Sequence, residues 1–411
     1  MSPPVVINGR DVAPALLRLV VARTDDGWVL GRPDLNLYVA VPEPGAVLIE
    51  ALRETGSLTV ATARACTVAG VDVDGADFVE GLLRVGLLAP PAESGPEPGR
   101  PRTREVRWIH TVSPRTARRL FGPTAWSVYT TAALTCVGLL AAVPALRPTY
   151  ENAWFLTDPV LSVLAYLPIA VVLGAAHEAW HWLAGRAIGV PARFRVSYRG
   201  IYLVFETDLT QLVTRPRRQR YGPFLAGMAF DCCMLVVALL ARLAYQRGVL
   251  ALPPTLYRVL GAVVLFTILA IVWQWAALFA RSDGYAVLAN LLRCHDLHRA
   301  TWLTTKRRIW RLSDDEQREL DETSRHDRAV ARWFGLVSIL GIVTMAWVML
   351  TYRVPFLVLM GAWLLTNLQQ FSLTRSTLEA AVMVLYLLAV YLGPVALAVR
   401  ERAMRRSGSL R

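Results

Sequence analysis

The sequence predicts a mainly α-helical protein: a polytopic helical membrane protein with about six spans, preceded by a small N-terminal α+β domain. Two observations predict this class. Hydrophobic residues make up 55% of the 411 residues, which is more than an ordinary water-soluble domain contains. After residue 122 they form runs that approach or exceed the roughly 20 residues needed to cross a bilayer. We therefore divide the chain into residues 1–90, 91–122 and 123–411.

The first 90 residues have the patterns of a small domain. Two strands are expected around the sequence Asp25-Asp26-Gly27, which is typical of a β-hairpin, and a third strand and three helices should follow. The expected strands are residues 17–23, 28–31 and 37–41, and the expected helices are residues 45–54, 58–69 and 74–85. The last of these helices begins with acidic residues, which suit a helix N-terminus.

The segment between this domain and the spans has two parts. Residues 90–101 are rich in proline, glycine and glutamate, a composition that predicts a flexible linker. Residues 102–119 are basic and contain Trp108, with Phe121 just beyond. Such a stretch suits a membrane surface.

Seven apolar runs follow, and the arginines between them predict the topology. The runs are residues 124–143, 160–189, 222–243, 256–280, 333–351, 354–371 and 378–399. Arginine gathers in residues 191–221 and 281–332, and arginine-rich loops stay in the cytosol. The N-terminus lacks the basic-then-apolar pattern of a signal peptide. We therefore expect a multi-pass protein of the cell membrane with a cytoplasmic N-terminal domain.

The arginine-rich C-terminal tail also favours the cytosol, which requires an even number of spans. Residues 354–371 are short for a span and end in polar side chains. We therefore expect about six spans, with that segment re-entrant or interfacial. Two elements are predicted in the cytosolic loops: a hairpin at residues 194–196 and 201–205, and a helix opened by a capping box at Ser313.

The net charge of +13 comes almost wholly from arginine, because Lys306 is the one lysine among 44 basic residues. The arginines flank apolar runs, where they anchor topology and do not indicate nucleic-acid binding. Within residues 1–90 they are sparse and offset by acids, so DNA is not an expected partner there either. The five cysteines show no C-x-x-C spacing, and we expect free thiols.

The sequence His177-Glu178-Ala179-Trp180-His181 carries the most chemistry in the chain. It has the form H-E-x-x-H, and residues four apart lie on one face of a helix. Both imidazoles can therefore reach one Zn²⁺, with Glu178 beside them as general base. Ionisable groups inside a span are costly, which favours a functional role. The alternatives are a chance pair of helix histidines and a di-iron site, which would need more histidines near the membrane.

A zinc site of this kind needs a third protein ligand. The remaining histidines lie outside the spans: His110, His295, His298 and His326. Asp283 is the better candidate, because it ends the fourth span on the cytosolic side, at the depth of H-E-x-x-H in the second span. Gly284 would let the chain turn sharply there. The alternative for Asp283 is a simple helix-end charge, and His295 with His298 could be loop histidines or part of a second metal site.

The two motifs together resemble the site-2 protease family of membrane zinc metallopeptidases, over about residues 160–292. The sequence Ser-Asp-Gly-Tyr-Ala-Val-Leu around Asp283 is similar to that of bacterial relatives that mature ribosomally made peptides. The resemblance implies that His177, His181 and Asp283 bind zinc and that Glu178 is the general base.

One stretch departs from that family. Its members often have Ala-Gly-Pro-x-x-Asn in an intervening span, where the asparagine helps to hold substrate. Here residues 225–231 have Leu-Ala-Gly-Met-Ala-Phe-Asp, and Asp231 is the approximate counterpart. Asp231 is therefore a candidate substrate-binding residue, and the alternative is a polar group paired inside the bundle.

Residues 1–90 resemble the winged-helix leader-peptide recognition domains of ribosomal-peptide pathways, whose small type member is the peptide chaperone of pyrroloquinoline quinone biosynthesis. The resemblance rests on Gly-Arg-Pro-Asp at residues 31–34 and on Gly-Leu-Leu-Arg-Val-Gly-Leu-Leu at residues 81–88. It implies that a leader peptide adds as a strand to residues 37–41, against the helix at residues 74–85.

The expected function is therefore that of a zinc metalloendopeptidase in the membrane, which matures a ribosomally synthesised precursor peptide by removing its leader. One alternative is a regulatory intramembrane protease that cuts a membrane-anchored signalling protein. An alternative of another class is a non-catalytic membrane binding or export partner that keeps the zinc site for structure.

Overall fold

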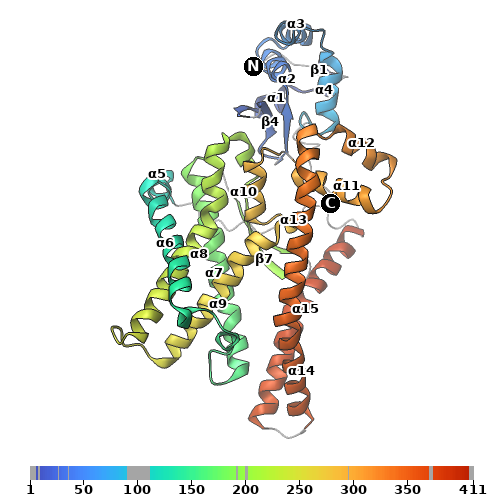
Figure 1. Ribbon diagram of the computed structural model, residues 1–411. Coiled ribbons are helices and arrows are strands. Elements are labelled where there is room, and N and C mark those ends of the chain that lie inside the picture. Colours follow the sequence, from blue (N-terminus) through green and yellow to red (C-terminus); the bar gives the residue numbers. More distant parts are fainter. Residues whose placement is uncertain are drawn as a thin grey trace.

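The computed structural model describes residues 6–7, 10–25, 27–35, 37–89, 112–190, 193–199, 202–294, 296–369 and 374–406. A small N-terminal domain lies at one end of a bundle of long helices (Figure 1). The predicted linker at residues 90–101, together with Trp108, His110 and His295, falls outside the described residues.

The N-terminal domain contains a three-stranded antiparallel sheet in the order β3-β4-β5, with helices packed against it. Its elements are β1 (Val6–Ile7), β2 (Arg10–Asp11), α1 (Ala13–Arg18), β3 (Val20–Thr24), β4 (Gly27–Arg32), β5 (Leu37–Val41), α2 (Glu43–Thr55), α3 (Leu58–Ala69) and α4 (Gly75–Arg84). The prediction of a strand from residue 17 is wrong at its start, because Leu17 and Arg18 belong to α1. Pro14 favours a helix start at this point, and the turn of α1 buries Ala15 and Leu16 in the core.

Arg32, at the end of β4, is fully buried and holds this domain together. Its Nη1 donates to the carbonyl of Leu87, 2.9 Å away, and thereby ties the sheet to the segment after α4. Its Nε and Nη2 donate to the two carboxylate oxygens of Asp34 at 2.9 and 2.8 Å. These hydrogen bonds from Arg32 lower the pKa of Asp34 below its ordinary value, because they favour the charged carboxylate.

The bundle contains five helical stretches that are long and apolar enough to cross a membrane, within the part of the chain that the structure describes. They involve α5 (Pro114–Leu120) with α6 (Pro123–Ala142), α7 (Pro159–Ala187), α8 (Arg217–Gln246), α9 (Pro254–Ala276), and α13 (Arg325–Val348) with α14 (Val354–Leu368). Helix α8 contacts α6, α7 and α9, so it is central to this group.

The expectation that residues 354–371 form a segment separate from the preceding span is wrong. Helix α13 continues into α14 through one π-helical turn, Met349–Arg353. Pro355 follows that turn and has no amide hydrogen to donate, and a wide π turn accommodates such a gap. Helix α15 (Arg375–Arg406) packs on α14 and runs back toward the end of the bundle where α11 and α12 lie (Figure 1).

The remaining elements lie between these long helices. They are η2 (Pro144–Leu146), η3 (Tyr150–Ala153), β6 (Arg193–Arg199), β7 (Tyr202–Asp208), η4 (Thr210–Thr214), η5 (Leu278–Ala280), α10 (Asp283–Leu291), α11 (Leu297–Ile309) and α12 (Asp314–Glu322). The predicted hairpin is confirmed as β6 and β7, and the capping box at Ser313 is confirmed at the start of α12. Strands β3 and β4 contact η4, and the amide of Arg217 donates to Asp25, so the N-terminal domain docks at the start of α8.

Candidate metal centre

Helix α7 carries the H-E-x-x-H sequence in its last third. The helix begins where the side chain of Asp158 accepts hydrogen bonds from the amides of Val160 and Leu161, which is the usual role of an N-cap aspartate. His177 and His181, one turn apart, are 7% and 2% exposed. The helix therefore presents both imidazoles on one buried face, as the spacing predicts.

Asp283 reaches the same place from a different element than expected. It does not end the fourth span: α9 stops at Ala276, a 3-10 turn follows, and Asp283 is the first residue of α10. The reversal occurs at Arg281, whose φ of 55° is left-handed. Gly284 serves close packing and not the turn, because a Cβ there would lie 2.4 Å from the main-chain oxygen of Gln274.

Three ligand-type atoms converge at this point. Asp283 Oδ2 lies 3.0 Å from His177 Nε2 and 2.9 Å from His181 Nε2, and the two nitrogens are 3.1 Å apart. Ligands about 2.0 Å from a tetrahedral zinc ion are about 3.3 Å from one another. The triangle of donors thus has nearly the dimensions that Zn²⁺ requires.

The outer nitrogens of both rings fix which atoms carry protons. His181 Nδ1 lies 2.6 Å from the carbonyl oxygen of Pro223, which can only accept, so this nitrogen donates. His177 Nδ1 donates in the same way to Asp231 Oδ2, at 2.9 Å. In the neutral rings both Nε2 atoms then carry lone pairs directed at a carboxylate oxygen. Such a group of acceptors repels itself unless a cation lies among them, and outer donors of this kind are typical of metal-binding histidines.

Helix α8 closes the site through a residue without a side chain. A Cβ on Gly227 would lie 2.3 Å from His177 Nε2 and 2.4 Å from His181 Nε2. Any other residue there would occupy the space in which the two nitrogens meet. Gly227 was not predicted as a site residue, although it belongs to the stretch at residues 225–231 that the sequence analysis compared with the family.

Asp231 lies one turn further along α8, beside His177. It is 5% exposed, and its Oδ2 accepts from His177 Nδ1. Asp231 is thus paired inside the bundle, one of the two alternatives expected for it, and its contact with substrate stays a prediction. A buried carboxylate in this place orients the imidazole and makes it a better metal ligand.

Glu178 projects toward β7. Its Oε2 accepts from the backbone amide of Thr207 at 2.9 Å, and its main-chain oxygen accepts from the hydroxyl of Thr207 at the same distance. One ligand atom from each of His177, Glu178 and His181 lies within 4.8 Å of the others. The hairpin thus holds the carboxylate beside the two histidines.

Two residues that complete the site had weak sequence signals or none. Gln274 Oε1 accepts from the amide of Asp283 at 3.0 Å, and the main-chain oxygen of Gln274 accepts from Ser282 Oγ at 2.6 Å. A glutamine in an apolar span was a signal that could have been used. Thr207 lies in a loop hairpin and belongs to no motif, so its role depends on the fold alone.

The other described histidines are not brought to this site. His298 Nε2 donates to the carbonyl of Phe279 at 3.0 Å, and His326 Nε2 donates to that of Leu292 at 2.7 Å. His326 does group with Cys294 and Asp327, whose ligand-type atoms lie within 4.8 Å of one another. The predicted absence of disulfides is confirmed, because all five cysteines are free.

No protein-family model, no curated protein and no solved structure matches the chain. The donor atoms themselves indicate the chemistry. Two imidazole nitrogens and a carboxylate oxygen form a set of three protein ligands of the kind that catalytic zinc sites use. The side chain of Asp283 remains 26% exposed, so this ligand lies on the side from which water can approach.

Proposed function

We propose that the protein is a membrane-embedded zinc metalloendopeptidase. The observation that carries the proposal is the mutual approach of His177 Nε2, His181 Nε2 and Asp283 Oδ2 within 3.1 Å, with both outer nitrogens already donating. The adjacent carboxylate of Glu178 supplies a base, which a purely structural zinc site would not need.

His177, His181 and Asp283 would hold the metal ion. When bound, Zn²⁺ polarises a carbonyl group and lowers the pKa of a water molecule. Glu178 accepts the proton of the attacking water and returns it to the leaving amine, and Thr207 holds the Glu178 carboxylate in place. Asp231 and the carbonyl of Pro223 keep both rings in the required tautomer.

Strand β7 offers a place for the substrate beside Glu178. The amide of Thr207 points at Glu178, and therefore away from its partner Phe194 in β6. Backbone groups alternate in direction along a strand, so the amides of Phe205 and Leu203 face the same side, on which no described strand pairs with β7. An extended peptide added at that edge would run beside Glu178. The addition of a strand to a sheet edge is a common mode of peptide binding.

We further propose that the substrate is a ribosomally made precursor peptide, recruited through residues 1–90. Among the described residues β5 pairs only with β4, so its other edge is open to a leader peptide. Phe78 of α4 and Val41 of β5 both lie against Gly45, which brings the winged-helix-like strand and helix together. Strands β3 and β4 instead contact η4 of the bundle.

Two alternatives can be distinguished from the proposed peptidase by simple experiments. A regulatory intramembrane protease would cut a membrane-anchored protein, and adding a leader peptide to its substrate would barely raise the rate of cleavage. A non-catalytic partner would bind zinc without cleaving. Titrating the full-length protein with a precursor leader and with a random DNA duplex tests recruitment. Steeply salt-dependent duplex binding without leader binding would contradict it.

The central experiment is mass spectrometry of a precursor peptide incubated with purified protein, with and without a chelator. We expect cleavage that stops on chelation and that Glu178→Gln abolishes while zinc stays bound, because an amide cannot accept the proton from water. Glu151→Gln, at an exposed glutamate outside α7, is the matched control and should cleave normally. Near-normal turnover by Glu178→Gln would refute the proposed role of Glu178.

A further inference from the structure

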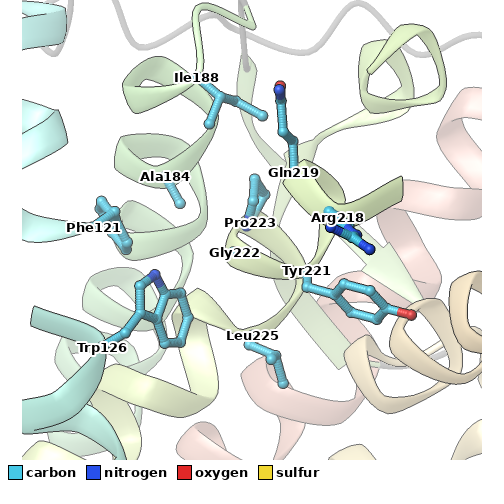
Figure 2. A pocket seen from close by; sticks show the side chains of 10 residues that line it. All are labelled: Phe121, Trp126, Ala184, Ile188, Arg218, Gln219, Tyr221, Gly222, Pro223 and Leu225. Carbon is cyan, nitrogen blue, oxygen red and sulfur yellow. The ribbon is translucent and has the colours of Figure 1, made fainter. Parts of the chain in front are cut away.

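A cavity of about 320 Å³ lies between the start of α6, the end of α7 and the start of α8. Its walls are mostly apolar and come from all three helices: Phe121 and Trp126, Ala184 and Ile188, and Leu225. Figure 2 shows Phe121, Trp126 and Ala184 on one side of the cavity and Arg218, Gln219 and Tyr221 on the other. The volume is at the lower end of the range for small-molecule sites, about 300–1,000 Å³.

Arg218 is the one charged residue among the described residues that line this cavity. None of its ten lining residues is acidic, and Arg218 is exposed. Within the part of the chain that the structure describes, no ion pair is recorded for Arg218. Further arginines lie on the neighbouring elements: Arg115, Arg118 and Arg119 of α5, Arg186 of α7, and Arg217 and Arg220 of α8.

The position of the cavity and the chemistry of its lining residues indicate which kind of ligand it binds. All three wall helices begin or end here, so the cavity lies at the level of lipid headgroups, where tryptophan and tyrosine are common. Its apolar interior fits part of an acyl chain, and Arg218 fits a phosphate, which guanidinium groups bind well. We propose that this cavity binds an anionic phospholipid, with an acyl chain between Trp126 and Leu225 and the phosphate on Arg218.

An occupant would touch residues that hold the metal centre. Pro223 lines the cavity, and its carbonyl accepts from His181 Nδ1 at 2.6 Å. Trp126 packs edge-on against Tyr129 at 5.4 Å, and Tyr129 OH accepts from Trp180 Nε1 in the H-E-x-x-H sequence at 3.2 Å. Lipid in the cavity therefore stabilises the arrangement of His181. This coupling rests on the proposed function, whereas the lipid site itself does not.

Lipid binding can be tested without any cleavage assay, by native mass spectrometry of the full-length protein titrated with phosphatidylglycerol or phosphatidylcholine. We expect the first phosphatidylglycerol to bind about fivefold more tightly than phosphatidylcholine. Both lipids carry a phosphate, but the choline ammonium offsets its charge beside Arg218, whereas phosphatidylglycerol keeps a net negative charge. Arg218→Gln should remove that preference. Arg247→Gln, at an exposed arginine just beyond the other end of α8, is the control and should keep it.

The proposed position of the acyl chain is tested by variants that fill the cavity. A Cβ on Gly222 meets only Trp126, at 3.7 Å, so the side chain of Gly222→Leu projects into the cavity. Gly222→Ala fills little of the cavity and is the control for any effect of a side chain on folding. Gly222→Leu should weaken binding of the first phosphatidylglycerol about tenfold, and Gly222→Ala much less. Unchanged binding by Gly222→Leu and Arg218→Gln would overturn the proposal, as would displacement of the lipid by equimolar inorganic phosphate. Zinc content, measured alongside, tests the coupling to His181 separately.

Discussion

The N-terminal domain and the metal centre are built in opposite ways. In the domain, an apolar core forms between neighbouring elements. Arg32, the one fully buried charged side chain among the residues of the domain that the structure describes, is satisfied by groups up to 57 residues away. In the metal centre, His177 and Asp283 are 106 residues apart and meet inside an apolar bundle. Breaking the contacts of Arg32 is therefore expected to lower the stability of the domain. Breaking the contacts among His177, His181 and Asp283 is expected to release the metal.

The largest effect is expected from the three metal ligands. His177→Ala, His181→Ala and Asp283→Ala should each lower zinc affinity by more than about 100-fold, because two protein ligands hold zinc poorly. Bound zinc per protein, measured in detergent, checks this, with circular dichroism as the control for helix content. Full loading of Asp283→Ala beside empty histidine variants would show that Asp283 is not a ligand.

Asp231 should have the next largest effect, and it separates a positioning role from a substrate contact. Asp231→Ala removes the acceptor for His177 Nδ1, and losses of about 10–100-fold in metal affinity are typical of such changes. Asp231→Asn keeps an acceptor oxygen and should recover much of the affinity. A variant with normal zinc affinity but raised KM would restore the substrate role that the resemblance implied.

The comparison also explains which parts of the fold the sequence could predict. Strand β5 and helix α3 were predicted at their observed ends, because a short apolar run rich in valine and a glycine after a helix are local features of the sequence. Helix α1 was missed because the apolar residues near Leu17 suit either element, and burial against the rest of the domain decided between them. The long helix through residue 349 was divided because residues 354–371 are short for a span and end in polar side chains. The π turn that joins them to α13 is not encoded by any pattern.

In the site, the predictable residues were those on one helix. His177, Glu178 and His181 follow from spacing alone, and Asp283 from membrane depth, although the depth argument assigned it to the wrong helix. Gly227 and Thr207 depend on how α8 and β7 pack against α7. Such contacts between distant segments leave no periodic trace in a single sequence.

A smaller effect is expected from Arg32, and it tests whether damage stays within the domain. Arg32→Met leaves the carbonyls of Leu87 and Ala89 without their donor, which should destabilise the domain by about 2–3 kcal/mol. Hydrogen exchange of the full-length protein should show faster exchange in β4, while zinc content stays normal. Loss of zinc in this variant would show that the two regions are coupled after all. Arg64→Met, at an exposed ion pair, is the control.

The smallest effect is a pH dependence of the same contact. The pKa of Asp34 is lowered in the folded domain by its hydrogen bonds from Arg32, so its contribution is present above the unfolded pKa of about 3.9 and is lost as the pH falls through the lower folded value. Asp34 is 37% exposed on its side chain, and solvent screening keeps the contribution below about 1 kcal/mol. In the wild type, hydrogen exchange in β4 should therefore become faster below about pH 4, after the rates have been corrected for the pH dependence of intrinsic exchange. In Asp34→Asn that added acid sensitivity should disappear, because no proton binds there. An identical acid response in both proteins would assign the sensitivity to other carboxylates and leave Arg32 with its carbonyl contacts alone.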